Sequence, residues 1–281
     1  MRTNNLRQLE KKILHILLQV ITFVLRIGRR LERRILSLQK GLSSFDWSKA
    51  IFIYQPGKVA SSTITEALSA EYNAPVVQIH SFDRDGGEHE LNADLKKLQK
   101  NGSLPKLKII SLIRDPFSRN LSAFFQNLNK YQNNSVSFDG NYLDVQGLWD
   151  VYMCSPGSNW ILEWWDLELK RNFGIDVFSV TFPDSGHVLI ENDKASLLLM
   201  RYDLADNLKS NLISTFVGIA EFDLSKYTAN VSKKKSYFSQ YEQMKTRPVT
   251  VEYFDRLYNS RYCQHFFSKE LAGLKERWIT S

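Results

Sequence analysis

The stretch IFIYQPGKVASST (residues 51–63) predicts a strand, a glycine-lysine turn and the beginning of a helix. An apolar run leads into Gly57 and Lys58, and three hydroxyl residues follow before the helical segment ITEALSA. In such a turn a phosphate group can bind the lysine and the N–H groups at the helix N-terminus. The ATP- and GTP-binding pattern G-x-x-x-x-G-K-[ST] does not fit, because Phe52 stands at its first glycine and Val59 follows the lysine. The stretch therefore predicts a phosphate loop of another kind.

A simpler interpretation of the same residues stays open. Ser61 or Ser62 would cap the helix by accepting hydrogen bonds from its first N–H groups, and Lys58 would be solvated. A phosphate site, unlike a cap, needs further cationic or hydrogen-bonding groups from elsewhere in the chain.

A second stretch, IISLIRDPFSRNLSAFF (109–125), supplies such groups. Arg114 directly follows an apolar run typical of a strand buried on both faces, and Ser122 comes eight residues later on a helix that Pro116 begins. An arginine fork and a serine hydroxyl so placed could hold one phosphate from two sides. The alternative is that Asp115 caps the helix and Arg114 pairs with an acidic residue.

Outward from these stretches, predicted strands and helices alternate, which indicates an α/β fold with a mainly parallel sheet flanked by helices. We expect the carboxyl ends of the strands to lie along one edge. The expected strands are 50–55, 75–80, 107–113, 175–182, 187–192 and 197–203, and the expected helices are 61–71, 89–100, one from Pro116 and 158–174, ending at Gly174. Residues 130–148 are expected to form a loop, and the last third to form aromatic-rich helices.

The net charge of +7 belongs to the N-terminal arm. Residues 1–45 hold ten Lys and Arg against two Asp and Glu, or +8, which leaves 27 basic and 28 acidic residues, or −1, in 46–281. A nearly neutral body argues against a nucleic-acid partner. Two cysteines are too few for a disulfide scaffold, and a reducing compartment is the simpler expectation.

We expect two parts, a basic amphipathic helical arm (1–45) and an α/β domain (46–281). The uncharged segment 13–25 would span roughly 20 Å as a helix, short of the ~30 Å hydrocarbon core. Three roles for the arm stay open: binding to an anionic membrane surface, self-association, or a short membrane anchor. The expected location is the cytoplasm, peripheral to the membrane or anchored in it.

Together the two stretches resemble motifs of sulfotransferases that use 3′-phosphoadenosine-5′-phosphosulfate (PAPS). PGKVASST is similar to their 5′-phosphosulfate loop, RDPFSRNLS to their 3′-phosphate motif, and LLLMRYDLADNL to a strand and turn that many members share. The chain is most similar to a bacterial group of capsular polysaccharide synthesis proteins, over roughly residues 48–270. This resemblance implies a P-loop-type α/β fold that does not hydrolyse nucleoside triphosphates.

The resemblance also implies roles for single residues. Lys58 would hold the 5′-phosphosulfate and offset the charge that develops on the leaving oxygen. Arg114 and Ser122 would hold the 3′-phosphate, with Arg119 either assisting or solvated. The family usually has glycine at position 60, whereas this chain has Ala60. The exact shape of the loop therefore stays open, although the charges that it offers do not change. The rest of the cradle would be Gly57, Ser61, Ser62 and Thr63.

A base is needed to take the proton of an attacking hydroxyl group. His80 ends the second predicted strand and should lie at the same sheet edge as Lys58 and Arg114, and several sulfotransferases place a catalytic histidine there. Glu88 and His89 are the rival candidates, since some carbohydrate sulfotransferases use an acidic base.

An aromatic stretch and a lysine run have structural alternatives to a functional role. The aromatic residues of WILEWWDLELK (160–170) fit a helix packed on the core better than a sugar-stacking surface. The run SKKKS (232–236) would either approach the 3′-phosphate or an acidic glycan, or be solvated as most charge runs are. No spacing suggests a metal site, so no metal is expected.

The predicted function is PAPS-dependent transfer of a sulfuryl group to a carbohydrate hydroxyl, for example of a capsular or other cell-surface polysaccharide. His80 would be the base and Lys58 would stabilise the leaving group. One alternative is a non-catalytic scaffold of polysaccharide assembly that retains the fold. A kinase-like phosphotransferase is a weaker alternative, because the ATP-binding pattern does not fit.

Overall fold

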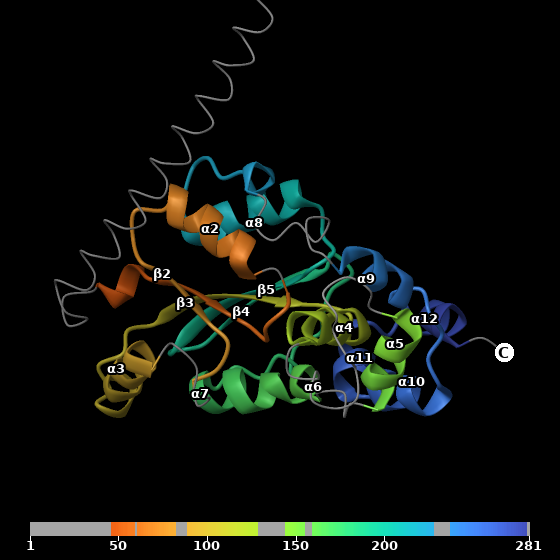
Figure 1. Cartoon of the computed structure of the whole chain (residues 1–281). Coiled ribbons are helices and arrows are strands. Elements are labelled where there is room, and N and C mark those ends of the chain that lie inside the picture. Colours follow the sequence, from red (N-terminus) through yellow and green to blue (C-terminus); the bar gives the residue numbers. More distant parts are fainter. Residues whose placement is uncertain are drawn as a thin grey trace, which may run out of the picture. The chain divides into compact units, whose positions relative to one another are not determined.

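A five-stranded sheet, in the order β2-β1-β3-β5-β4, forms the centre of the computed structural model (Figure 1). The structure describes residues 46–59, 61–82, 89–128, 144–154, 159–227 and 237–279, at 89–94 by the main chain alone. The strands β1, β2, β3 and β5 run parallel, and β4 is antiparallel to β5. The strands are β1 (Ile51–Tyr54), β2 (Val76–Ile79), β3 (Leu107–Ile113), β4 (His187–Glu191) and β5 (Ala195–Arg201).

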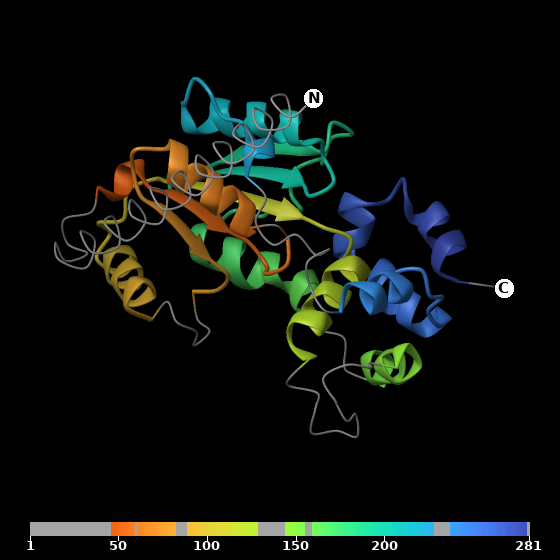
Figure 2. The same ribbon diagram turned by 45° about the horizontal axis from the view of Figure 1, so that its top comes forward.

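The helices form two layers on the sheet and a group at one end of it. In both views α2 and α8 cover one face, and the helical run from α6 to α7 covers the other (Figures 1 and 2). The helix α4 and the C-terminal helices lie beyond the carboxyl ends of the strands. The helices are α2 (Ser61–Glu71), α3 (His89–Lys100), α4 (Pro116–Gln126), α5 (Val145–Cys154), α6 (Trp160–Trp164), α7 (Arg171–Phe173), α8 (Asp206–Val217), α9 (Phe238–Met244), α10 (Val251–Tyr258), α11 (Arg261–Phe266) and α12 (Leu271–Trp278), with a π-helical segment η4 (Trp165–Lys170) between α6 and α7.

The alternation of side chains along β1 explains why both faces need a helical layer. Ile51 and Ile53 are buried in an aliphatic core with residues of α2 and α8. Tyr54 faces the other way and packs against Trp164 at 4.8 Å and Phe173 at 5.8 Å between ring centroids. All four residues of β1 are buried, as expected for a central parallel strand.

Most of the predicted elements are confirmed. The helices 61–71 and 89–100 and the strand 107–113 have the expected bounds, and the helix from Pro116 is capped by the Asp115 side chain, which accepts from the Ser118 N–H at 2.7 Å. The helical run that begins at Trp160 ends at Gly174, whose φ of 71° is left-handed.

Two predictions were wrong. Residues 175–182 form turns and not a strand, because the Asp176 side chain accepts from the Phe178 N–H at 3.0 Å and turns the chain there. Part of the predicted loop 130–148 is helical, since α5 begins at Val145.

The stretch 160–170 belongs to the core, as expected: Trp164, Trp165 and Leu169 are buried.

The N-terminal arm lies outside the described residues, so its predicted roles stay predictions. The same holds for SKKKS (232–236) and most of the predicted loop 130–148. Within the described part of the chain no helix combines the length and apolarity needed to cross a membrane. Cys154 and Cys263 are both free.

Candidate functional site

The loop after β1 and the end of β3 are joined by two arginines. Arg114 directly follows β3 and donates from Nη1 to the main-chain oxygen of Lys58 at 2.7 Å. Arg119, on the first turn of α4, donates from Nε to the main-chain oxygen of Gly57 at 3.0 Å. Arg119 is buried, so the solvated alternative for it is wrong. The structure thus brings together the two sequence stretches whose pairing predicted a phosphate site.

Lys58 occupies a strained position at the tip of this loop. Its φ is 76°, the left-handed region that residues with a Cβ seldom adopt. A Cβ added to Gly57 would meet nothing within 4 Å, so the fold itself does not require glycine at that position. Strain at a residue with a charged side chain, beside a glycine that the fold does not need, is the pattern of a binding loop.

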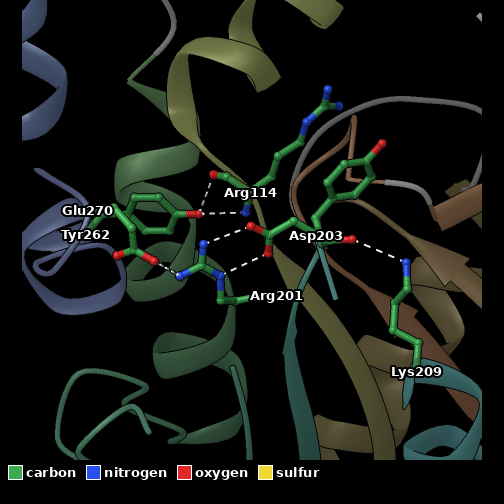
Figure 3. A network of polar contacts seen from close by, with 7 residues as sticks. Arg114, Arg201, Asp203, Lys209, Tyr262 and Glu270 are labelled. Carbon is green, nitrogen blue, oxygen red and sulfur yellow. Dashed lines mark hydrogen bonds and ion pairs between the residues drawn. The ribbon is translucent and has the colours of Figure 1, made fainter. Parts of the chain in front are cut away.

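Arg114 is held in place at both its main chain and its side chain. The Tyr262 hydroxyl accepts from the Arg114 N–H at 3.0 Å and donates to its carbonyl oxygen at 2.8 Å (Figure 3). The guanidinium lies over the Tyr202 ring, 4.5 Å from its centroid, and its Nη2 is 3.5 Å from the Tyr241 hydroxyl. Its Nε is buried and has no partner among the described residues. An unpaired buried donor of this kind suits an anionic ligand.

Ser122 lies on the same face of α4 as Arg119 and Phe125, one turn from each, because residues three apart are neighbours on a helix. Arg119 contacts the loop, and Phe125 packs against Tyr241 at 5.5 Å between ring centroids. Ser122 therefore lies on the helix face that is directed toward the loop and Tyr241, and its side chain is half-buried.

The predicted hydroxyl residues begin α2. Ser61 is buried, and Ser62 and Thr63 are half-buried in the first turn, where main-chain N–H groups have no partner within the helix. Ala60, the departure from the family motif, lies outside the described residues. So does Glu88, and His89 begins α3 with a side chain that is not described.

His80 follows β2 and is half-buried, and its hydrogen bonds define its tautomer. Its Nδ1 is 2.9 Å from the Gln55 carbonyl oxygen, which only accepts, so Nδ1 carries the proton. Its Nε2 is 3.2 Å from Gln78 Nε2 and accepts from that amide. Thr65 donates to Gln78 Oε1 at 3.0 Å, which orients the amide in this way. The nitrogen with the lone pair is therefore Nε2.

The surroundings of His80 lower its pKa below the usual 6.5. The main cause is burial, and the positive charges of Lys58 and Arg119 act in the same direction, whereas the hydrogen bond to Gln55 opposes them. His80 is thus neutral at neutral pH and close enough to Lys58 to interact with its charge. The sequence-based expectation that both lie at one sheet edge agrees with this arrangement.

Sequence reasoning missed Glu168, a carboxylate that is 1% exposed. It accepts hydrogen bonds from the Tyr54 hydroxyl, from the Ser81 hydroxyl at 2.5 Å and from the Phe82 N–H at 3.0 Å. Glu168 lies in the π-helical segment, a helix form that is frequent at functional sites. The neighbouring Trp164 donates from Nε1 to the His80 carbonyl oxygen at 2.7 Å. The sequence holds no clear signal for this role, because the same helical run also contains the acidic residues Glu163 and Asp166.

The described part of the chain contains no group of three or more His, Cys, Asp or Glu side chains that could hold a metal ion. The arrangement instead offers cations, hydroxyl groups and N–H groups to an anion, and a neutral histidine beside them.

A family model described as "Putative capsular polysaccharide synthesis protein" matches residues 145–268. The match begins at α5 and ends just after α11, so it includes Glu168, Tyr202, Tyr241 and Tyr262 but not the loop after β1. It spans less than half of the chain. The searches found no matching curated protein and no matching solved structure.

Proposed function

We propose that this chain is a sulfotransferase that uses PAPS as the sulfuryl donor and a carbohydrate hydroxyl as the acceptor. The observation that carries the proposal is the contact between Arg114 and the loop carbonyl of Lys58. Through this contact a 3′-phosphate group at Arg114 and a 5′-phosphosulfate at the loop would be bound by parts of one connected site. ATP has no 3′-phosphate to occupy the Arg114 end.

The residues present fit the donor. The Lys58 ammonium and the N–H groups at the start of α2 suit the 5′ end. The Arg114 Nε, buried without a partner among the described residues, suits the 3′-phosphate, with the Ser122 hydroxyl on the facing helix. The donor supplies a sulfuryl group on a phosphate leaving group, and Lys58 would stabilise the charge that develops there.

His80 would act as the general base. In the transfer, the acceptor oxygen would form a bond to sulfur while the bond from sulfur to the phosphate oxygen breaks, and the hydroxyl proton would pass to His80 Nε2. Nε2 holds the available lone pair, and the acceptor hydroxyl would take the place of the Gln78 amide. The lowered pKa keeps this nitrogen unprotonated at neutral pH.

A capsular or other cell-surface polysaccharide is the proposed acceptor. The support is the similarity of residues 145–268 to the capsular polysaccharide synthesis family. A sugar hydroxyl also fits the mechanism, because it attacks poorly unless a base removes its proton.

Calorimetry tests the proposal by comparing 3′-phosphoadenosine-5′-phosphate (PAP), the reaction product, with ADP, which lacks the 3′-phosphate, and with magnesium ATP. We expect PAP to bind at least about tenfold more tightly than ADP, since a charge-assisted hydrogen bond contributes roughly 1.5–3 kcal/mol. Arg114→Ala should remove this preference. Equal affinity for PAP and ADP, or tight binding of magnesium ATP alone, would exclude the proposed donor.

A control separates Arg114 from the neighbouring charges. Arg201→Ala removes another arginine at the same sheet edge, whose guanidinium is paired with Asp203 at 2.8 Å and with Glu270. Figure 3 shows the Arg114 side chain extending away from this group. Arg201→Ala should therefore retain the preference for PAP over ADP.

A further inference from the structure

A concave site lies at the same edge of the sheet, beside β4 and β5. It is a cavity of about 790 Å³, walled by the turn residues 178–184, by Arg201 at the end of β5, and by residues 264–266 and 268–270. It includes none of the residues assigned to the donor or to the base. Its volume lies in the range of pockets that bind organic ligands, about 300–1,000 Å³.

The cavity adjoins the donor site through two contacts. Arg201 is paired in register with Ile113, the residue before Arg114, on the neighbouring strand. The Tyr262 hydroxyl binds the main chain of Arg114, and the Tyr262 ring packs against Phe266 of the cavity wall at 5.2 Å between centroids. The cavity is thus separated from the main chain of Arg114 by one strand pairing and one aromatic ring, and in the strand order it lies beyond Arg114 as seen from the ends of β1 and β2.

Aromatic rings provide the apolar part of the wall. Phe266 is buried, and the half-buried ring of Phe182 packs against it at 5.0 Å between centroids, whereas the half-buried Phe178 ring is covered by the Arg261 guanidinium at 4.1 Å from its centroid. Partly exposed aromatic faces suit the C–H faces of sugar rings, because both surfaces are apolar and flat.

The charged side chains of the wall are already paired. Lys269 contacts Asp184 at 2.5 Å, and Arg201 is paired with Glu270 and, outside the wall, with Asp203. Burial lowers the pKa of His265, which also lines the cavity, and favours its neutral form. The charges of the described wall therefore balance, two cations against two carboxylates, and the wall offers many oriented donors and acceptors to hydroxyl groups.

We propose that this cavity is a subsite for a neutral segment of an oligosaccharide, which it binds by stacking on Phe182 and by hydrogen bonds to the paired polar groups around that ring. The inference rests on the proposed function and deepens it, because the bound segment would be part of the acceptor chain about three strand spacings, or roughly 14 Å, from the hydroxyl that is modified beside His80. A nucleotide or an acidic glycan would place its negative charge beside Asp184 and Glu270, the carboxylates that balance the two cations of the wall. A purely apolar ligand would leave the polar groups of the wall without partners.

The test uses saturation-transfer NMR and calorimetry on the full chain with defined probes. The neutral probes are hexaoses of glucose, galactose and N-acetylglucosamine, and the anionic probe is hexagalacturonate. Phe182→Ala removes a stacking ring, and Ser268→Trp fills the cavity from an exposed position without removing any core side chain. Leu189→Ala, which truncates an exposed apolar side chain outside the cavity, is the control.

We expect at least one neutral hexaose to bind and its affinity to fall about tenfold, or roughly 1.4 kcal/mol, in Phe182→Ala and in Ser268→Trp but not in Leu189→Ala. Absence of binding by all neutral probes, unchanged binding in both cavity variants, or binding of hexagalacturonate alone would overturn the inference. PAP binding is measured on the same samples. If PAP binds and the hexaoses do not, only the inference fails, and the reverse result removes the proposed donor but leaves the subsite.

Discussion

Arg114 donates a hydrogen bond to the main-chain oxygen of Lys58 at 2.7 Å, although 56 positions separate the two residues in the sequence. Together with the bond from Arg119 to Gly57, this contact ties the loop after β1 to the end of β3 and the start of α4. The arginine expected at the 3′-phosphate thus also holds the loop expected at the 5′-phosphosulfate. Replacing Arg114 would weaken both ends of the site at once.

Two replacements of Lys58 separate its charge from its backbone strain. Lys58→Ala and Lys58→Gly both remove the ammonium group, so both should weaken PAP binding. Glycine adopts a φ of 76° without a Cβ clash, so Lys58→Gly should have a free energy of unfolding higher than that of Lys58→Ala by on the order of 0.5–1 kcal/mol. Urea unfolding measures this difference, and a less stable glycine variant would contradict the left-handed conformation.

Gly57→Ala should reduce PAP affinity while leaving stability almost unchanged. The added methyl group meets no protein atom within 4 Å, so the free energy of unfolding should change by less than about 1 kcal/mol. The methyl group would instead occupy space above the loop that a bound phosphate needs. Thermal unfolding and PAP calorimetry on one preparation check both statements. A large loss of stability, or full PAP affinity, would show that Gly57 does not mark the ligand surface.

Stability should depend on pH through His80. Its folded pKa is lowered below the unfolded value of about 6.5, so the unfolded chain binds the proton more readily. Stability due to this group is present above pH 6.5 and is lost as pH falls through the folded pKa. All other titrating groups are shared by the wild type and His80→Gln, so the difference between their free energies of unfolding reports on His80 alone. Relative to His80→Gln, the free energy of unfolding of the wild type should fall between pH 7.5 and pH 5. A difference that is constant across this range, or that moves in the opposite direction, would contradict the burial of His80.

Gln78→Glu should raise the pKa of His80. The new carboxylate would stand where the Gln78 amide now lies, 3.2 Å from Nε2, and would stabilise the protonated ring. Gln243→Glu, at an exposed position of α9 beside the Ser239 hydroxyl, is the matched control. NMR titration of the His80 ring should show a higher pKa only in Gln78→Glu. The same pKa in wild type and Gln78→Glu would mean that the amide does not face Nε2.

Glu168→Gln should destabilise the protein and loosen the chain just after His80. The amide cannot accept from all the donors that the carboxylate now satisfies, so the free energy of unfolding should fall by about 1–3 kcal/mol. Hydrogen exchange of the Phe82 N–H should also become faster than in wild type. The exposed Glu163 of the same helical run provides the control, since Glu163→Gln should change neither property. An unaltered exchange rate of the Phe82 N–H in Glu168→Gln would show that the Glu168 carboxylate does not hold the segment after β2.

The amino-acid sequence by itself determined the elements whose signals are local. Asp115 and Pro116 mark the beginning of α4, Gly174 marks the end of a helical run, and the apolar run 107–113 becomes the buried strand β3, because caps, breakers and burial patterns act within a few residues. The order of these elements also placed Arg114 and His80 after parallel strands. That order was sufficient to predict a shared edge.

Only the tertiary structure decided the contacts between distant segments. Tyr262 binds the main chain of Arg114 from 148 positions away in the sequence. Glu168 accepts from Ser81 and Phe82, which lie more than 80 positions before it. No local sequence pattern predicts contacts at such separations. The tautomer of His80 is defined by the Gln55 carbonyl, which becomes its neighbour only when β1 and β2 pair, whereas Gln78 lies two residues before it on the same strand face. The wrong strand at 175–182 has a local cause instead: the Asp176 side chain accepts from the Phe178 N–H two residues later, and this turn overrides β propensity.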